Sequence, residues 1–202
     1  ITDGDLDTDS DYRDITAAFA FEDDGPSIEA NATAVPTLTT DDTDIDDSAG
    51  PTSFADLFTS AFGNDDFKDA DDNDVEDDDA IAYALSVSSA GVDSGLDDTV
   101  SGDNILLRVN AAGTEVEGYL SSDDTTVAFK ITLDADTGDI TLTQNRAIYH
   151  DDDEDSVETG SAAEKMTTAE LIRLTATITD GDLDTDSDYR DITAAFAFED
   201  DG

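Results

Sequence analysis

ITDGDLDTDSDYRDITAAFAFEDDG occupies residues 178–202 of this chain and recurs, unchanged, at residues 1–25. An identity of this length does not arise by chance, so the offset of 177 residues (178 minus 1) is the expected period of a tandem array. We therefore expect residues 1–25 to repeat the final strand and linker of a preceding module, and residues 26–202 to form one module.

The first half of this stretch places an aspartate at every second position around one glycine, and it predicts a calcium-binding loop. Carboxylates and backbone carbonyls are the oxygen ligands that calcium takes in proteins. The candidate ligands are Asp180, Asp182, Asp184, Asp186 and Asp188 in the second copy, and Asp3, Asp5, Asp7 and Asp9 in the first. Solvated acid in a salty medium, without specific ion sites, is the open alternative.

The second half of the stretch alternates in period two, which is typical of a half-buried strand. The residues expected on one side of this strand are Ile192, Ala194, Phe196 and Phe198. We expect the strand, residues 189–198, to form a hairpin with the alternating run at residues 171–178 across the aspartate loop. The first copy has no such run before it in the chain, and its pairing with a neighbouring molecule stays open.

An acidic run follows the alternating segment in both copies. The candidate ligands there are Glu22, Asp23 and Asp24 in the first copy, and Glu199 and Asp200 in the second. Pro26 comes directly after the first copy and restricts the backbone on both of its sides. The pattern predicts a stiff, acidic joint between modules, at which carboxylates from both sides could share a cation.

Charge dominates the composition, with 8 basic against 54 acidic residues and a formal net charge of −46. This balance excludes nucleic acid as a partner and argues against docking on anionic membranes. Two carboxylates about 6 Å apart repel by roughly 1 kcal/mol in bulk water and roughly 3 kcal/mol at a protein surface. The folded chain therefore needs cations, either bound at specific sites or as a salty medium. It has no cysteine, so neither disulfides nor thiolate metal sites can form.

Two further acidic segments, residues 64–79 and 151–155, are candidate calcium loops. Their candidate ligands are Asp69, Asp71 and Asn73 in the first segment, and Asp151 and Asp153 in the second. The first segment begins like an EF-hand loop, but Asp74 stands where that loop needs glycine and Ala80 where it needs a bidentate glutamate. It is not an EF-hand, and a merely solvated loop remains an alternative for both segments.

Short runs with period-two alternation, separated by Gly and Asp turns, predict an all-β fold. The expected strands are residues 34–39, 81–88, 105–110, 116–120, 126–133 and 139–144, in addition to the hairpin. Phe54, Leu57 and Phe58 follow helical spacing, so we expect one short amphipathic helix between Ser53 and Gly63. The whole pattern favours an antiparallel β-sandwich with one short helix and long acidic loops.

Enzyme motifs are weak in this sequence. Asp136-Thr137-Gly138 matches one half of an aspartic protease site, which needs two such carboxylates, and it occurs once within an expected hairpin turn. His150 is the only histidine, which excludes zinc sites built from several histidines. A glycosidase needs one carboxyl in an apolar environment, and the sequence marks none. We expect no enzymatic activity and no small-molecule substrate.

Several motifs together resemble the long repeat of giant bacterial RTX adhesins exported by type I secretion. In order, they are Phe21-Glu22-Asp23-Asp24-Gly25-Pro26, Tyr83-Ala84-Leu85-Ser86-Val87, Gly91-Val92-Asp93-Ser94-Gly95-Leu96 and Leu174-Thr175-Ala176-Thr177-Ile178-Thr179-Asp180-Gly181-Asp182. The resemblance covers nearly the whole period and is specific in the order of its motifs. The chain departs from the family in the extra acid at residues 64–79 and in Leu183, within a loop that more often reads Asp-Gly-Asp-Gly-Asp.

The resemblance implies an Ig-like extender module on the bacterial cell surface, stiffened by several calcium ions and flanked by copies of itself. Such modules project an adhesive tip for surface attachment and biofilm formation. Two other classes stay open from the residues alone. The module could itself bind a sugar, a surface or a protein, or it could be a halophilic protein without specific ion sites.

Overall fold

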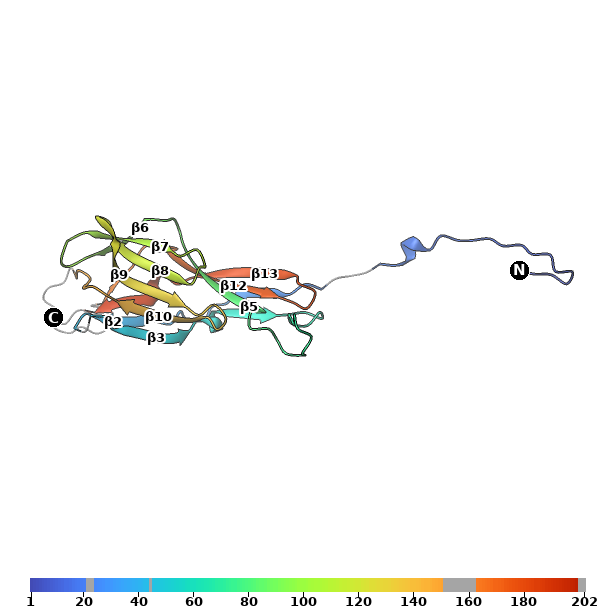
Figure 1. Cartoon of the computed structure of the whole chain (residues 1–202), viewed down its shortest axis with the longest axis horizontal. Coiled ribbons are helices and arrows are strands. Elements are labelled where there is room, and N and C mark those ends of the chain that lie inside the picture. Colours follow the sequence, from blue (N-terminus) through green and yellow to red (C-terminus); the bar gives the residue numbers. More distant parts are fainter. Residues whose placement is uncertain (21–23, 44, 151–162, 200–202) are drawn as a thin grey trace.

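The structure, a computed structural model, describes residues 1–20, 24–43, 45–150 and 163–199. The described residues from 24 onward form an elongated body of strands, and residues 1–20 extend away from one end of it (Figure 1). Helical structure among the described residues is confined to three short 3-10 turns, and none has the length or apolarity needed to cross a membrane. The predicted all-β class is confirmed.

The larger layer of the body is one antiparallel sheet of six strands (Figure 1). Its order is β3 (Ser48–Ser53), β10 (Asp139–Gln144), β9 (Asp123–Leu133), β8 (Glu115–Leu120), β7 (Asn104–Val109) and β6 (Val92–Asp97). Strands β8 and β10 bury every second residue, because alternate side chains of a strand point to opposite faces. The predicted strands of this layer are confirmed to within a few residues at each end.

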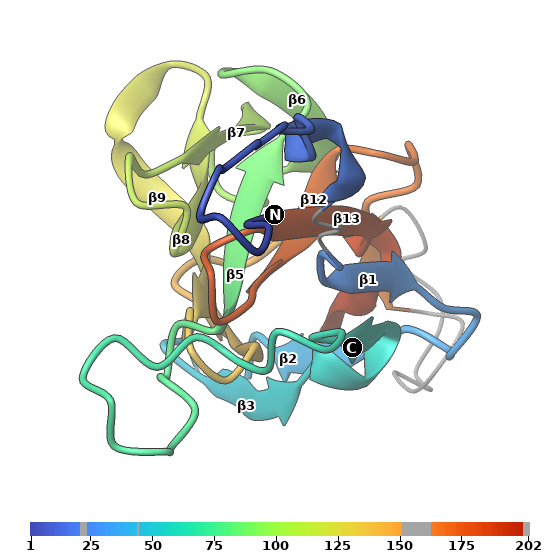
Figure 2. The ribbon, with the colours of Figure 1, turned by 90° about the vertical axis from the view of Figure 1, so that its right-hand side faces the viewer.

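Smaller sheets make up the opposing layer (Figure 2). They are β13 (Thr185–Asp191), β12 (Ile172–Thr179) and β5 (Ile81–Val87); β11 (Glu164–Lys165), β14 (Phe196–Glu199) and β2 (Leu38–Asp41); and β1 (Ser27–Ala30) with β4 (Phe58–Ala61). The described pairs are antiparallel except for β14 with β2. Phe129 of β9 and Phe198 of β14 pack with ring centroids 5.1 Å apart, so one apolar core joins the layers as in a β-sandwich.

The predicted hairpin forms, but its second strand, β13, begins at Thr185, four residues earlier than expected and within the predicted aspartate loop, and it ends at Asp191. Strand β12 buries Ile172, Leu174, Ala176 and Ile178 and pairs antiparallel with β13. The prediction of one continuous strand at residues 189–198 is wrong, because a 3-10 turn at Thr193–Ala195 breaks it. After the turn the chain enters β14, in a different sheet. Thr193 and Ala197 are buried with the apolar residues, while Ala194 is exposed.

The predicted helix between residues 53 and 63 is also wrong. A single 3-10 turn, Ala55–Leu57, is followed at once by β4, which pairs with β1. Phe54, Leu57 and Phe58 are buried as expected, because one tight turn also brings them to the same side. The sequence Phe-Thr-Ser then favours a strand, and the partner offered by β1 decides the outcome.

Strands β1, β3, β6 and the two-residue β11 were not predicted, and β2 begins later than the predicted strand at residues 34–39. Strand β3 is mostly exposed at the edge of its sheet, and the pairing of β6 with β7 is irregular. Neither has the clean alternation that marks a strand in sequence.

Candidate metal centre

The turn between β12 and β13 folds tightly around the side chain of Asp180. The backbone N–H of Asp180 donates to the carbonyl of Asp184 (3.1 Å), and that of Leu183 donates to the carbonyl of Asp180 (3.2 Å). The N–H of Asp184 donates to Oδ1 of Asp180 (2.8 Å). Leu183 adopts a left-handed φ of 78°, which closes the turn. The turn therefore fixes one oxygen of the Asp180 carboxylate by a backbone bond.

The other oxygen of the Asp180 carboxylate indicates a site for a cation. Asp180 is fully buried, at 0% exposure, and its Oδ2 has no hydrogen-bond partner among the described residues. Asp98 is equally buried, but Arg146 donates to both of its oxygens (2.7 and 3.0 Å). Burying a carboxylate without a positive partner lowers the stability of the fold by several kcal/mol, so a cation near Asp180 would stabilise it.

Two further carboxylates converge on Asp180. One oxygen each from Asp65, Asp180 and Asp182 lies within 4.8 Å of the others. Asp182 belongs to the same turn, whereas Asp65 comes from the loop after β4, more than a hundred residues earlier in the chain. That loop is held against the turn by a bond from the N–H of Gly181 to the carbonyl of Asp66 (3.1 Å) and by an isolated bridge between Phe67 and Asp180.

Gly181 allows this close approach. A Cβ atom at position 181 would lie 2.3 Å from the carbonyl oxygen of Asp65, a distance that real Cβ atoms do not reach. The glycine is therefore required by the loop that crosses it. None of the ion pairs among the described residues involves Asp65, Asp180 or Asp182. The cluster is all oxygen and strongly anionic, which fits a hard divalent cation.

Asp186 and Asp188, predicted as ligands, lie further along β13 and contact β1. Oδ2 of Asp186 accepts from the N–H of Ile28 (3.0 Å), and Oδ2 of Asp188 accepts from the N–H of Ala30 (2.7 Å). The bonds from Ala30 and from the N–H of Tyr189 lower the pKa of Asp188. The two carboxylates thus hold β1 at the edge of β13 by side-chain bonds.

Residues 24–26, which we call the entry linker, lie at the same end of the body as the β12–β13 turn. Oδ2 of Asp24 accepts from the backbone N–H of Asn64 (2.9 Å) and from its side-chain amide (2.6 Å). Gly63 permits this contact, because it adopts a φ of +82° and a Cβ there would lie 2.9 Å from the carbonyl oxygen of Asp24. Asp184, also predicted as a ligand, lies near Gly25 of the linker, with its Oδ2 3.9 Å from a Cβ placed there.

The other predicted ligands are distributed as follows. Asp69 and Asp71 converge with Asp77, and both oxygens of Asp69 accept backbone N–H groups, from Asn73 (3.2 Å) and Asp74 (2.8 Å). Asp3, Asp5 and Asp7 also converge, fully exposed, and Asp9 is not part of their group. Glu199 ends β14, where it pairs with Asp41 of β2, and it is not part of any of these groups. Glu22, Asp23, Asp151, Asp153 and Asp200 lie outside the described residues.

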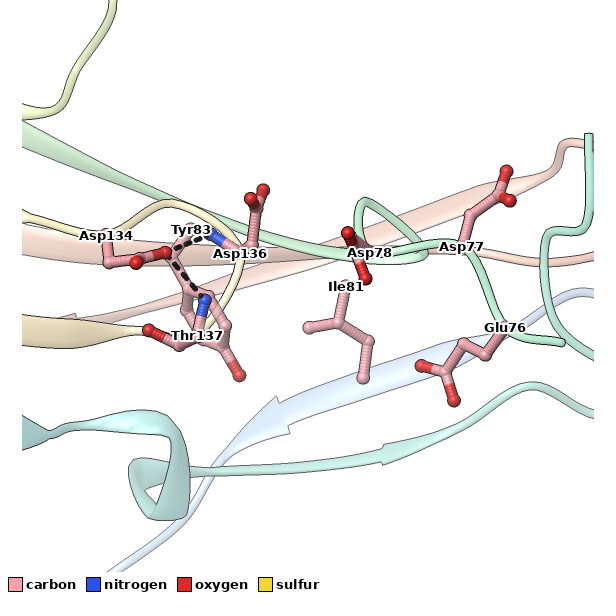
Figure 3. A pocket seen from close by; sticks show the side chains of 8 residues that line it. All are labelled: Glu76, Asp77, Asp78, Ile81, Tyr83, Asp134, Asp136 and Thr137. Carbon is pink, nitrogen blue, oxygen red and sulfur yellow. Dashed lines mark hydrogen bonds between the residues drawn. The ribbon is translucent and has the colours of Figure 1, made fainter.

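An open acidic pocket of about 540 Å³ lies beside the β9–β10 turn (Figure 3). Its lining residues are Glu76, Asp77, Asp78, Ile81, Tyr83, Asp134, Asp136 and Thr137. The predicted hairpin turn is confirmed here, because the carboxylate of Asp134 accepts the N–H groups of Asp136 and Thr137 (3.1 and 3.2 Å). Among the described residues that line this pocket there is no histidine, lysine or arginine.

Comparison with protein families gives one match, a domain of unknown function called DUF5801, over residues 37–193. This match spans most of the chain. The protein belongs to the DUF5801 family. The matched DUF5801 region contains Asp65, Asp180 and Asp182, whereas the first copy of the repeated stretch and Asp24 lie before it. Neither the curated proteins nor the solved structures contain a match to this chain.

Asp180 and Asp182 were predicted as ligands from the sequence, whereas Asp65 and Asn64 were not singled out. Both lie at the start of the acidic segment, ahead of the Asp-x-Asp motif at Asp69. Their neighbour Gly63, at the end of the predicted helix, has a positive φ of 82°, but it follows a strand. No local pattern marks the loop residues that cross the distant turn.

Proposed function

We propose that this DUF5801 chain is a structural extender module of a cell-surface RTX adhesin, an Ig-like β-sandwich that calcium stabilises and stiffens. The observation that carries the proposal is the buried carboxylate of Asp180, which has an unpartnered oxygen and two further carboxylates beside it. The module would lie outside the cell, in tandem with copies of itself, and would hold an adhesive tip away from the surface.

The energetics of the cluster support a bound cation. Asp65, Asp180 and Asp182 have oxygens within 4.8 Å of one another, and at that separation each pair repels by roughly 3.5 kcal/mol at the effective dielectric of a protein surface. Calcium, when bound, supplies two positive charges and accepts roughly six to eight oxygen ligands in flexible geometry. Occupancy at a hundred times the dissociation constant would add about 2.7 kcal/mol to the stability of the fold.

The arrangement of the chain supports an end-to-end array. The linker enters beside the β12–β13 turn, and β14 lies towards the opposite end of the long axis (Figure 1). Since residues 178–199 repeat the sequence of residues 1–22, the strand that ends one module would lead directly to the entry side of the next. The cluster then lies at the joint, where an ordered ion has the greatest effect on stiffness.

A ligand-binding module is the alternative, and it has less support. Tyr189 is an exposed aromatic residue on β13 beside a small cavity, as a sugar platform would require. However, the guanidinium of Arg173 covers its ring at 4.4 Å from the centroid, so that face is already occupied.

Thermal unfolding tests the proposal. We expect millimolar calcium to raise the melting temperature by about 5–10 °C over sodium chloride of equal ionic strength with EDTA. Asp180→Asn and Asp182→Asn should abolish this shift. Asp3→Asn and Asp5→Asn are matched controls, since they make the same changes in the first copy, and should retain it. Equal melting temperatures for the unmodified chain in the two media would refute stabilisation by calcium and favour the halophilic explanation over it.

A further inference from the structure

The residue that belongs to the candidate metal centre and the residue that binds the entry linker are adjacent in the loop after β4. Asp65 supplies a carboxylate to the candidate metal centre, and its neighbour Asn64 holds Asp24 of the linker through two hydrogen bonds to the same oxygen. Asp24 itself is not part of the three-carboxylate cluster. The linker therefore contacts the loop beside the cluster, not the cluster.

We propose that Asn64 is the positioning residue through which cation binding at Asp65, Asp180 and Asp182 fixes the direction of the entry linker. This inference rests on the proposed function, because it requires the cluster to bind calcium. It assigns the coupling to one exposed amide in the loop after β4. The loop after β4 thus connects the two sites: Asp65 contacts the ion, and Asn64 contacts the linker.

The contacts of the loop explain why occupancy should matter. Among the described contacts, two hold residues 64–67 to the turn: the bond from the N–H of Gly181 to the carbonyl of Asp66, and the bridge of Phe67 with Asp180. Repulsion of Asp65 by Asp180 and Asp182 opposes both contacts while the carboxylates are not neutralised. A bound cation removes this repulsion, so the loop stays against the turn. The backbone and side-chain N–H donors of Asn64, the residue next to Asp65, are then held in a fixed position.

The contact between Asn64 and the linker depends on directional hydrogen bonds. Both donors of Asn64 converge on Oδ2 of Asp24, at 2.9 and 2.6 Å, and the carbonyl of Asp24 lies against Gly63. A single oxygen held from two directions has little freedom to swing. Loss of the side-chain donor leaves one backbone bond, about which the linker can turn.

Distance measurements between spin labels test the coupling. The chain has no cysteine, so Ala20→Cys on the linker side and Ser121→Cys on the body place two labels uniquely. Both positions are exposed. We expect calcium to narrow the distance distribution of the labelled chain relative to EDTA. With Asn64→Ala the distance distribution should stay broad in calcium, while calorimetry should show an unchanged calcium affinity.

Three further variants separate the possible failures. Asp182→Asn should lose both the narrowing and at least about tenfold in calcium affinity. Asp24→Ala should repeat the Asn64→Ala result from the linker side. Val75→Ala, a truncation of an exposed residue in the same loop, should behave as the unmodified chain.

Each remaining outcome overturns a specific claim. Full narrowing in Asn64→Ala would refute the coupling and leave the proposed function intact. So would calcium binding by the unmodified chain without any narrowing. Failure of the unmodified chain to bind calcium would refute the proposed function, and the coupling with it.

Discussion

The same sequence occurs twice in this chain in different surroundings, and its turns are alike in both. In the first copy the N–H of Asp3 donates to the carbonyl of Asp7 (3.0 Å) and Leu6 has a φ of 74°. These match the 3.1 Å bond from Asp180 to Asp184 and the φ of 78° at Leu183. A 3-10 turn also forms in both copies, at Thr16–Ala18 and at Thr193–Ala195. The turns are therefore encoded locally.

The strands differ between the copies. Residues 185–191 form β13, while the equivalent residues 8–14 form no strand and only an isolated bridge between Thr2 and Thr8. Ile192 and Phe196 are fully buried, at 0% exposure, whereas Ile15 and Phe19 are 58% and 63% exposed. Strand pairing and burial need β12 and the opposing sheet, which only the second copy has beside it. Aspartates fix the turns, and tertiary partners fix the strands.

The largest expected effect comes from removing the buried aromatic residue of one copy at a time. Phe196→Ala should lower the free energy of unfolding by about 3–5 kcal/mol, because it opens a cavity in the core. Phe19→Ala makes the identical change in the exposed copy and should leave stability unchanged within error. Urea denaturation of both variants measures the difference. A comparable loss in Phe19→Ala would show that the first copy packs on the body.

The comparison also explains which parts of the fold could be predicted. The β12–β13 hairpin and the strands of the large sheet carry their own alternation and turn residues, so the sequence sufficed for them. The break at Thr193 could not be seen, because the period-two alternation of the sequence continues across it, from Ile192 to Phe198. The spacing of Phe54, Leu57 and Phe58 suits one helical turn as well as a helix, and only the pairing of β4 with β1 decides between them.

The candidate site was predictable to the same extent. Asp180 and Asp182 lie in one locally encoded turn, so their proximity follows from sequence. Asp65 joins them only because its loop crosses Gly181, a contact between distant parts of the chain. Asp186 and Asp188 share the alternating pattern, but their carboxylates bond to β1, a strand that no sequence signal marked.

A second, smaller difference between the two copies is the effect of carboxylate protonation on the stability of the body. Burial acts to raise the pKa of Asp191, but donors from Thr193 and from the N–H of Glu170 outweigh it and lower the pKa below 3.8. Hydrogen bonds from Thr16 lower the pKa of Asp14 in the same direction. Because residues 1–20 are exposed outside the body, the Asp14 bonds should survive unfolding of the body, so of these two carboxylates only Asp191 should link protonation to stability.

Asp191→Asn should therefore cost about 1–3 kcal/mol at neutral pH, since it weakens several charge-assisted hydrogen bonds. A lowered folded pKa means that the contribution is complete above the unfolded pKa, near 3.8, and is lost as the pH falls through the folded value. The stability curves of Asp191→Asn and the unmodified chain should thus converge below about pH 4. Asp14→Asn is the control, and its curve should coincide with that of the unmodified chain throughout.

The smallest expected effect has the opposite sign and uses the turn that both copies share. Leu183 is exposed and holds a left-handed backbone conformation that costs a leucine about 1–2 kcal/mol more than a glycine. The greater freedom of glycine in the unfolded chain offsets about 0.5–1 kcal/mol of this gain. Leu183→Gly should accordingly stabilise the body by about 0.5–1 kcal/mol in EDTA, measured by urea denaturation. Leu6→Gly relieves the same strain in a segment whose conformation is not coupled to unfolding, and it should change nothing. Equal stabilisation by both variants would mean that the first copy unfolds together with the body, which its exposure contradicts.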